Sequence, residues 1–129
     1  RIIHTVAGTG YWGNTGDGGP AISAALAGPA GIAVVGDPDG NVTLFIADYY
    51  NGRVRAVTPD GIIRDISHSA DDGIQAPTRV AFARKSGWLY VADSSNDRLV
   101  VLNIARTAPS LLAARKPPAR VTGSGKVAG

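Results

Sequence analysis

Cysteine is absent from this 129-residue chain, which excludes both a disulfide framework and a thiolate metal site. Glutamate is also absent, so every acidic side chain is an aspartate, which suits turns because its short carboxylate can bond the local backbone. No apolar run is long enough to cross a bilayer, and we expect no membrane span. Methionine is missing even at position 1, which we interpret as a chain that is processed, truncated or observed in part.

The residues that are present indicate a folded chain of short strands. A hydrophobic content of 44% beside a charged content of 18% is too apolar for an intrinsically disordered segment. The 17 glycines and 8 prolines interrupt the backbone often enough to favour short strands and tight turns over long helices. The net charge of +3 is uneven, because residues 1–73 are acidic and residues 74–129 are basic.

Two segments of the chain occur twice. Residues 29–34 match residues 77–82, each a proline followed by a short alternating strand pattern. Residues 44–54 match residues 89–99, each with Ala-Asp before a turn and Asn-x-Arg after it. The first pair is 48 residues apart and the second pair 45, and this difference falls in a loop, which absorbs insertions better than a strand.

A repeat of this length that holds four antiparallel strands has the size of one propeller blade. A sandwich stays possible, but it gives no reason to repeat the same side chains at matching turns. We therefore predict an all-β fold, a partial β-propeller that contains two four-stranded blades. The expected strands lie near residues 31–35, 42–47, 53–58 and 61–66 and near residues 79–83, 88–92, 98–103 and 109–113.

The motifs inside these units resemble the NHL repeat. Residues 28–61 contain Gly-Pro-x-Gly-Ile-Ala-Val, Leu-Phe-Ile-Ala-Asp and Asn-x-Arg-Val-Arg-x-Val-x-Pro-Asp-Gly, and residues 77–104 contain a looser copy. The Gly-Asp-Gly-Gly-Pro-Ala sequence of residues 16–21 resembles the inter-blade linker of bacterial NHL proteins. The resemblance implies a propeller of about six blades, so missing blades or partner chains would cover the faces that two blades leave open.

This resemblance also implies the domain boundaries. Residues 1–28 are expected to hold the outer strand of the preceding blade and the inter-blade linker. Residues 29–76 are expected to form one blade and residues 77–113 a second, looser one. Residues 114–129 are basic and contain proline and glycine, and we expect an extended tail there.

The repeated turn supplies the first set of candidate residues. Its aspartate can accept hydrogen bonds from turn amides, its asparagine can adopt the left-handed conformation, and its arginine can pair with an aspartate of its own or a neighbouring blade. Because the set occurs twice, we predict a structural role and no catalytic one. The residues are Asp48, Asn51 and Arg53 in the first copy and Asp93, Asn96 and Arg98 in the second.

Aromatic side chains in or next to loops form a second candidate set. Rings with polar tips often anchor protein interfaces. Packing between blades explains them equally well, so both interpretations stay open. The residues are Tyr11, Trp12, Tyr49 and Tyr50.

No cofactor is predicted. Residues 37–41, Asp-Pro-Asp-Gly-Asn, have the carboxylate spacing of a calcium loop but lack its later acidic ligand, so a hairpin turn is favoured and calcium is a minor alternative. The glycines of residues 8–19 are not followed by the Gly-Lys-Ser/Thr of a phosphate-binding loop. His4 and His68 are expected on outer strands facing solvent, and two histidines do not make the three-ligand set of catalytic zinc.

The function that we expect is a non-catalytic scaffold for protein interaction, as a segment or subunit of a larger NHL-type propeller assembly. The linker resemblance implies a bacterial protein in an extracellular or periplasmic location. One alternative is an NHL module that binds RNA through the basic residues 74–129, although few aromatic residues are interleaved there for base stacking, so nucleic acid is not favoured. The other is a fragment of a metal-dependent propeller lyase whose histidines would lie in other blades.

Overall fold

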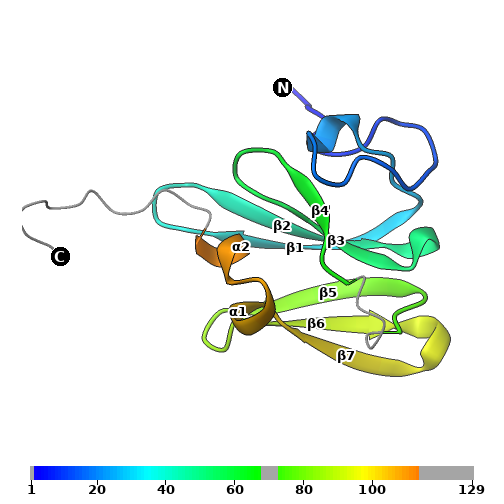
Figure 1. Ribbon diagram of the computed structural model, residues 1–129, viewed down its shortest axis with the longest axis vertical. Helices are drawn as coiled ribbons and strands as arrows, with labels where there is room; N and C mark the ends of the chain where they lie inside the picture. Colours follow the sequence, from blue (N-terminus) through cyan, green and yellow to red (C-terminus); the bar gives the residue numbers. More distant parts are fainter. Residues whose placement is uncertain (1, 68–72, 114–129) are drawn as a thin grey trace, which may run out of the picture.

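The computed structural model describes residues 2–67 and 73–113 of the chain (Figure 1). These residues form two antiparallel sheets that follow one another along the sequence. The predicted all-β class is confirmed, and so are the first seven of the eight expected strands. The first sheet has the order β1 (Pro29–Gly36), β2 (Val42–Asp48), β3 (Arg53–Val57) and β4 (Ile63–Asp65). The second has the order β5 (Pro77–Ala83), β6 (Trp88–Asp93) and β7 (Arg98–Asn103).

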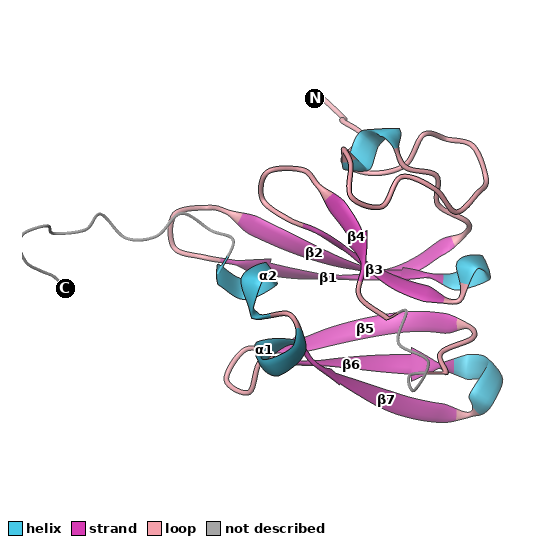
Figure 2. Ribbon diagram, in the orientation of Figure 1, coloured by secondary structure: helices cyan, strands magenta, loops and turns pink. Residues whose placement is uncertain are grey.

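Short helical segments connect or follow these strands (Figure 2). Two 3-10 turns, η2 (Tyr49–Asn51) and η3 (Ser94–Asn96), come directly after the second strand of each sheet, so the repeat in the sequence is also a repeat in structure. A third 3-10 turn, η1 (Ala21–Ser23), precedes the first sheet. Helices α1 (Ile104–Thr107) and α2 (Pro109–Ala113) follow β7.

The strand predicted near residues 109–113 is wrong, because this segment forms helix α2. The chain turns into helix α1 directly after β7, where the Asn103 side chain accepts a hydrogen bond from the Arg106 amide at 3.1 Å. In α2 two consecutive leucines pack on the core, Leu111 buried and Leu112 half-buried, whereas a strand would point them to opposite sides. The described part of the second sheet therefore has three strands, with β7 at its edge.

Residues 2–6 are extended and exposed, and they pair with no strand of the described ranges. The outer strand expected here would belong to a preceding blade, so it stays a prediction. Residues 7–28 then run as a loop over the side of the first sheet that faces away from the second (Figure 1). The Gly18 amide donates to the Ile63 carbonyl at 2.7 Å, which attaches this loop to β4.

Each sheet has two unlike faces, because successive side chains of a strand alternate. We call the front face the one that bears the aspartate at the end of the second strand, Asp48 in the first sheet and Asp93 in the second, and the back face the other. The front face of the second sheet packs on the back face of the first. Their common core joins Phe45, Ala47, Val54 and Ala56 of the back face to Val80, Leu89 and Val91 of the front face.

The two sheets approach each other closely at their first strands, β1 and β5. A Cβ atom on Gly31 would lie 2.7 Å from the Thr78 carbonyl oxygen and 2.9 Å from Arg79 Cα, so only glycine fits at this position. Phe45 of β2 and Phe82 of β5 also meet between the sheets, where their rings are stacked with centroids 5.6 Å apart. These contacts fix the two repeats in one front-to-back stack.

The loop of residues 7–28 covers part of the front face of the first sheet. A second buried cluster joins Ala21 and Ala24 of the loop to Ile46, Val57 and Ile63 of the sheet. The loop does not reach the β1 part of this face, where Ile32 and Val34 are exposed. The front face of the first sheet is therefore only half covered.

Candidate functional site

The repeated aspartates, Asp48 and Asp93, hold the chain that leads into each sheet. Asp48 Oδ1 accepts a hydrogen bond from the Ala27 amide at 2.8 Å. Asp93 Oδ1 accepts from the amides of Gln75 and Ala76 at 3.1 and 2.9 Å. These amides lie just before the first strand of each sheet and not in the turn, so the predicted acceptor role is right but the predicted donors are wrong. Each aspartate fixes the beginning of its own repeat.

The repeated asparagines, Asn51 and Asn96, connect the same turn to an incoming loop. The Asn51 side-chain amide donates to the aspartate of its repeat at 2.7 Å and to the Gly13 carbonyl at 2.8 Å. The Asn96 side-chain amide makes the equivalent pair of bonds, to the aspartate at 2.6 Å and to the Gly73 carbonyl at 3.1 Å. The turn and the preceding loop are therefore joined twice in each repeat.

The left-handed residue of each turn is the one that follows the asparagine. Gly52 has φ 63° and Asp97 has φ 51°. The prediction that the asparagine itself adopts this conformation is wrong, because the asparagine is the last residue of a 3-10 turn and the left-handed residue ends that turn. Aspartate is one of the few residue types with a side chain that tolerate this conformation.

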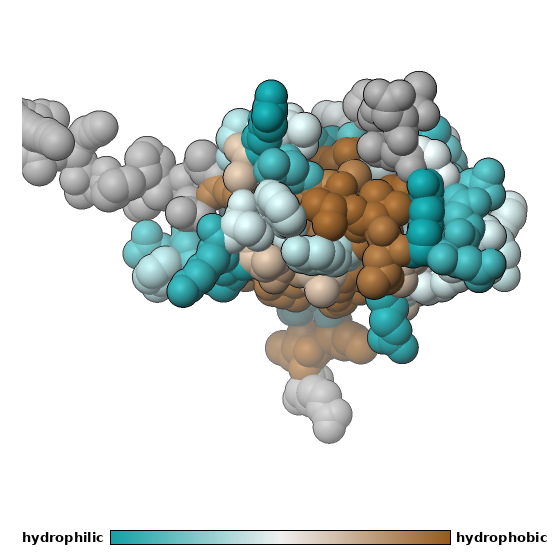
Figure 3. Space-filling model, turned by 90° about the horizontal axis from the view of Figure 1, so that it is seen from below, coloured by the Kyte–Doolittle hydropathy of each residue, from teal (hydrophilic) through white to brown (hydrophobic). Residues whose placement is uncertain are grey.

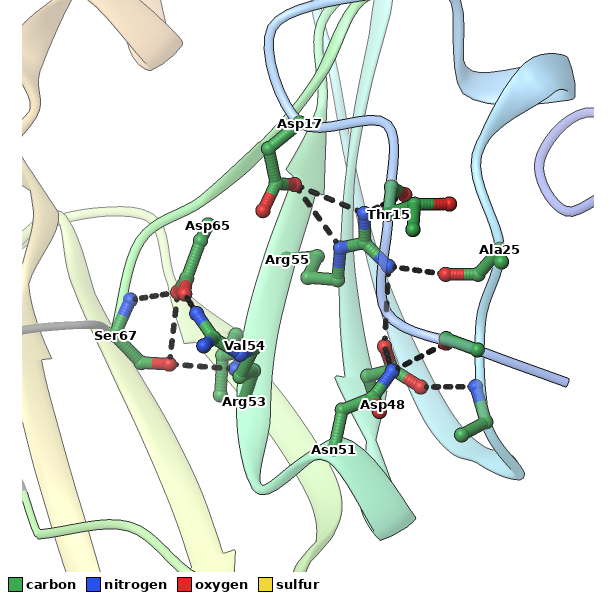
Figure 4. A network of polar contacts seen from close by, with 12 residues as sticks. Thr15, Asp17, Ala25, Asp48, Asn51, Arg53, Val54, Arg55, Asp65 and Ser67 are labelled. Atoms are coloured by element: carbon green, nitrogen blue, oxygen red, sulfur yellow. Dashed lines mark hydrogen bonds and ion pairs between the residues drawn. The ribbon is translucent and has the colours of Figure 1, made fainter.

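The repeated arginines bind different partners in the two sheets. Arg98 pairs with Asp93 of its own turn, with 3.4 Å between Nε and Oδ2. Arg53 instead forms an ion pair with Asp65 at the end of β4 (Figure 4). The predicted pairing with an aspartate of the same unit is seen in both sheets, but the repeat does not conserve the partner. In the first sheet the pair joins β3 to its outer neighbour β4.

Arg55 is the polar residue that the sequence reasoning missed. Its side chain is fully buried between the first sheet and the loop of residues 7–28 (Figure 4). The guanidinium donates to Asp48 Oδ2 at 3.2 Å and to Asp17 Oδ1 at 2.9 Å. It also donates to the carbonyls of Thr15 and Ala25, at 2.9 and 2.7 Å. Arg55 therefore fastens the loop to the sheet from inside.

Asp93 is ionised in the folded chain despite its burial. Burial alone raises the pKa of this carboxyl group, but hydrogen bonds from the Ala76 amide, the Asn96 side chain, the Gln75 amide and Arg98 together lower the pKa below its usual value of 3.8. A carboxylate that is held this way stabilises its surroundings and is poorly suited to donating a proton near neutral pH.

Residues 37–41 form the hairpin turn between β1 and β2 that the sequence favours. Asp37 Oδ1 accepts hydrogen bonds from the amides of Asp39 and Asn41, both at 2.9 Å, and Oδ2 accepts from the Asn41 side chain at 3.0 Å. The Asp37 carboxylate thus serves its own loop. Across residues 2–67 and 73–113, no three His, Cys, Asp or Glu side chains are grouped as metal ligands.

Only one of the two histidines, His4, lies within the described residues. His4 is exposed in the extended segment of residues 2–6 and not on a strand. His68 and the basic tail of residues 114–129 lie outside the described residues. Within the part of the chain that the structure describes, no helix has the length and apolar character needed to cross a membrane.

The four candidate aromatic residues gather beside the loop that precedes the first sheet. The Trp12 and Tyr50 rings lie 5.7 Å apart, and the Tyr49 ring meets Tyr50 edge-on at 4.8 Å. Tyr11, Trp12 and Tyr50 are mostly exposed, and a cleft of about 490 Å³ lies against the first two. Tyr11, Trp12 and Tyr50 therefore do not pack between the two described sheets, and the interface interpretation stays a prediction.

The back face of the second sheet is open and apolar. Figure 3 shows this side of the molecule, where apolar side chains gather on the surface. Leu99 on the edge strand β7 is 77% exposed. The exposed large side chains of this face are Trp88, Tyr90, Leu99 and Val101.

Comparison with known proteins supports the fold alone. No protein-family model matches the chain, and neither does any curated protein. A solved protein from Bacteroides thetaiotaomicron VPI-5482 named "Putative phosphatase" is similar with a TM-score of 0.58 and 22% identity over 74% of this chain. An auxiliary nutrient binding protein of the same strain gives 0.60 and 16% over 74%, and one from Bacteroides ovatus ATCC 8483 gives 0.56 and 19% over 70%. The chain spans only 25%, 28% and 26% of these three proteins.

Proposed function

We propose that this chain is a segment of an NHL-type β-propeller and serves as a non-catalytic scaffold. In this proposal its two open faces stack on further blades or on a partner chain. The observation that carries it is the front-to-back packing of the two repeated sheets. The same relationship, continued in either direction, would place a new sheet on the exposed front of β1 and on the exposed back of β6 and β7.

The chemistry of the two open faces supports this stacking. The front face offers Ile32 and Val34, as the front face of the second sheet offers Leu89 and Val91 to the core. The back face of the second sheet exposes large apolar side chains. The equivalent face of the first sheet is buried in the core against the second sheet. Contiguous apolar surface of this kind marks an interaction site on a folded protein. Front and back are unlike, so the contact is head to tail.

A complementation experiment tests the proposal. One variant blocks the front face with I32K and V34E, and another blocks the back face with L99K and V101E. The unmodified chain is expected to self-associate in sedimentation velocity, and each variant alone is expected to stay monomeric. Mixing the two variants is expected to give a one-to-one complex, because one retains an open back and the other an open front. I2K, which changes a largely exposed residue of the N-terminal segment that pairs with neither sheet, serves as the control.

Two results would contradict the proposal. An unmodified chain that remains monomeric up to its solubility limit would show that the faces do not attract each other. A front-blocked variant that still dimerises by itself would show that backs pair with backs, which a propeller stack does not allow.

A further inference from the structure

We propose that the cleft beside Trp12 binds a neutral saccharide, with the exposed indole ring as the platform on which a sugar ring stacks. This site lies on the loop of residues 7–28 and uses neither of the open faces in the proposed scaffold function. The saccharide proposal can therefore be tested independently of the scaffold proposal. The expected ligand is an uncharged ring that carries hydroxyl groups on its edge and C–H groups on its face.

The cleft has the size and composition of a small-molecule site. Its volume of about 490 Å³ falls in the usual range for such sites. Two threonine hydroxyl groups, an exposed tyrosine and glycine backbone provide polar groups, and leucine and proline provide apolar ones. The lining residues are Thr5, Ala7, Gly8, Thr9, Gly10, Tyr11, Trp12, Leu26, Gly28 and Pro29.

The aromatic platform is positioned before any ligand arrives. Trp12 is 74% exposed, yet its loop is closed on itself by the Gly13 amide, which donates to the Leu26 carbonyl at 3.1 Å. Asn51 of the repeated turn donates to the Gly13 carbonyl at 2.8 Å, so the turn supports the residue next to the indole. A platform whose position is already fixed loses little conformational entropy on binding.

Tyr50 lies beside Trp12 and next to Gly28, which lines the cleft. Its amide donates to the Ala27 carbonyl at 2.9 Å, and its ring lies over Gly28, where an added Cβ atom would be 2.6 Å from Cδ2. The Trp12 and Tyr50 rings are tilted by 54°, and Tyr49 supports Tyr50 from the side at 82°. Exposed rings in this arrangement offer one broad apolar surface at the rim of a cleft.

The charge of the cleft selects for a neutral ligand. No aspartate, lysine, arginine or histidine is among its lining residues in the described chain. An anion or cation would have to give up hydration without gaining an ion pair, which is costly. A neutral polyhydroxyl ring exchanges water hydrogen bonds for those of Thr5, Thr9 and the glycine backbone. Its C–H face meets an aromatic ring, whose face is electron-rich.

A proline-rich peptide is the nearest competitor, because such peptides dock in aromatic grooves. Those grooves use rings that stand side by side as slots for successive prolines. Here the rings meet tilted and edge-on and form a platform, and the cleft lining includes two threonine hydroxyl groups and glycine backbone. The geometry therefore favours the saccharide.

Titration of the intact chain with defined probes tests this assignment. The W88F variant leaves Trp12 as the single tryptophan, since the sequence contains two. Its fluorescence is followed during addition of maltohexaose, cellohexaose and mannohexaose, with trigalacturonate as a charged probe and decaproline as a peptide probe. At least one neutral hexasaccharide is expected to shift the emission saturably, and trigalacturonate and decaproline are not.

Variants separate stacking from general effects on the protein. W12A is expected to weaken binding of that hexasaccharide about tenfold or more in calorimetry, and T5V, which removes a hydroxyl group at nearly constant shape, is expected to weaken it less. W88A serves as the matched control, since Trp88 is also exposed and lies 6.4 Å from the Tyr90 ring on the other side of the molecule. Circular dichroism verifies that each variant is folded.

Several results would overturn the assignment. They are the absence of a saturable response to all three neutral probes, equal losses in W12A and W88A, and preferential binding of decaproline or trigalacturonate. The face-blocking variants described above are expected to keep saccharide binding, and W12A is expected to keep self-association. Failure of one proposal can thus be distinguished from failure of the other.

Discussion

Arg55 and Asp48 form an ion pair in which both side chains are fully buried, with 3.2 Å between Nη1 and Oδ2. The pair lies where the loop of residues 7–28 crosses the first sheet, and Asp17 of that loop binds the same guanidinium at 2.9 Å. Asp48, Asp17 and Arg55 therefore share one site. The Arg55 and Asp48 side chains are inaccessible to water, whereas the Asp17 side chain is 35% exposed. The contribution of this loop to the free energy of unfolding therefore depends on the contacts of Arg55.

Replacing Arg55 is expected to destabilise the chain strongly. R55M keeps the length of the side chain but leaves the buried Asp48 carboxylate without its cation, and loss of one partner in a buried pair costs about 3–5 kcal/mol. The measurement is the free energy of unfolding from urea denaturation. R64M is the control, because Arg64 is exposed on β4 and a substitution at such a position changes the free energy of unfolding by about 0.5 kcal/mol or less. Equal losses in both variants would contradict the structural role of Arg55.

Acid is expected to remove the contribution of Asp93 to stability. The pKa of this carboxyl group lies below 3.8 in the folded chain, so its stabilising effect is complete above that value. As the pH falls from 3.8 through the lower pKa of the folded state, that effect is lost. Urea denaturation at a series of pH values down to the acid range measures it.

The D93N variant tests whether Asp93 is the origin of this loss of stability in acid. D93N is expected to be less stable than the unmodified chain at neutral pH, and the difference should shrink as the pH falls through that range. D97N, which removes an exposed carboxylate at the end of turn η3, controls for the loss of one charge. A difference that stays constant with pH would argue against Asp93 as the origin.

A methyl group at Gly31 is expected to disturb the contact between the two sheets. G31A would place a carbon 2.7 Å from the Thr78 carbonyl oxygen, and such overpacking costs about 1–3 kcal/mol. Thermal unfolding of G31A and G36A gives the comparison. At Gly36 an added Cβ atom meets its nearest neighbour, the Asn41 carbonyl oxygen, at 3.7 Å, an ordinary contact. If both variants unfolded at the same temperature, β1 and β5 would not be packed as described.

Truncation of Leu111 is expected to show that helix α2 belongs to the core. Leu111 is 1% exposed, and its carbonyl accepts a hydrogen bond from the Thr43 hydroxyl at 3.1 Å. L111A is therefore expected to lower the free energy of unfolding by about 2–5 kcal/mol. L99A, at a largely exposed leucine, should change it by about 0.5 kcal/mol or less. A small effect of L111A would mean that the segment after β7 is not docked on the sheets.

Repetition in the sequence predicted the features that both repeats share. The aspartate and asparagine of each turn occupy equivalent places and share one hydrogen-bonding pattern, in which only the aspartates are buried. Repetition could not predict Arg55, because the equivalent position 45 residues later is Val100. Its partner Asp17 lies 38 positions away in an irregular loop whose path no local pattern specifies.

The end of the second repeat shows a second limit of pattern reasoning. The repeat favoured a fourth strand near residues 109–113. Instead, Asn103 caps helix α1 directly after β7, and Leu111 of the following helix α2 is buried in the core shared with the first sheet. Tertiary packing decides the conformation of such a short segment. The aromatic cluster illustrates the same point, because Trp12 and Tyr50 are far apart in sequence and only the fold of the loop brings them together.

The front-to-back stack of the two sheets is the claim on which the other inferences depend, and the two phenylalanines of the chain test it directly. Phe45 lies on the first sheet and Phe82 on the second, with ring centroids 5.6 Å apart. In a chain with isotopically labelled phenylalanine, we predict a strong nuclear Overhauser effect between the two rings, retained on dilution with unlabelled chain. Its absence, while the hydrogen-bonded registers within each sheet are observed, would contradict the stack.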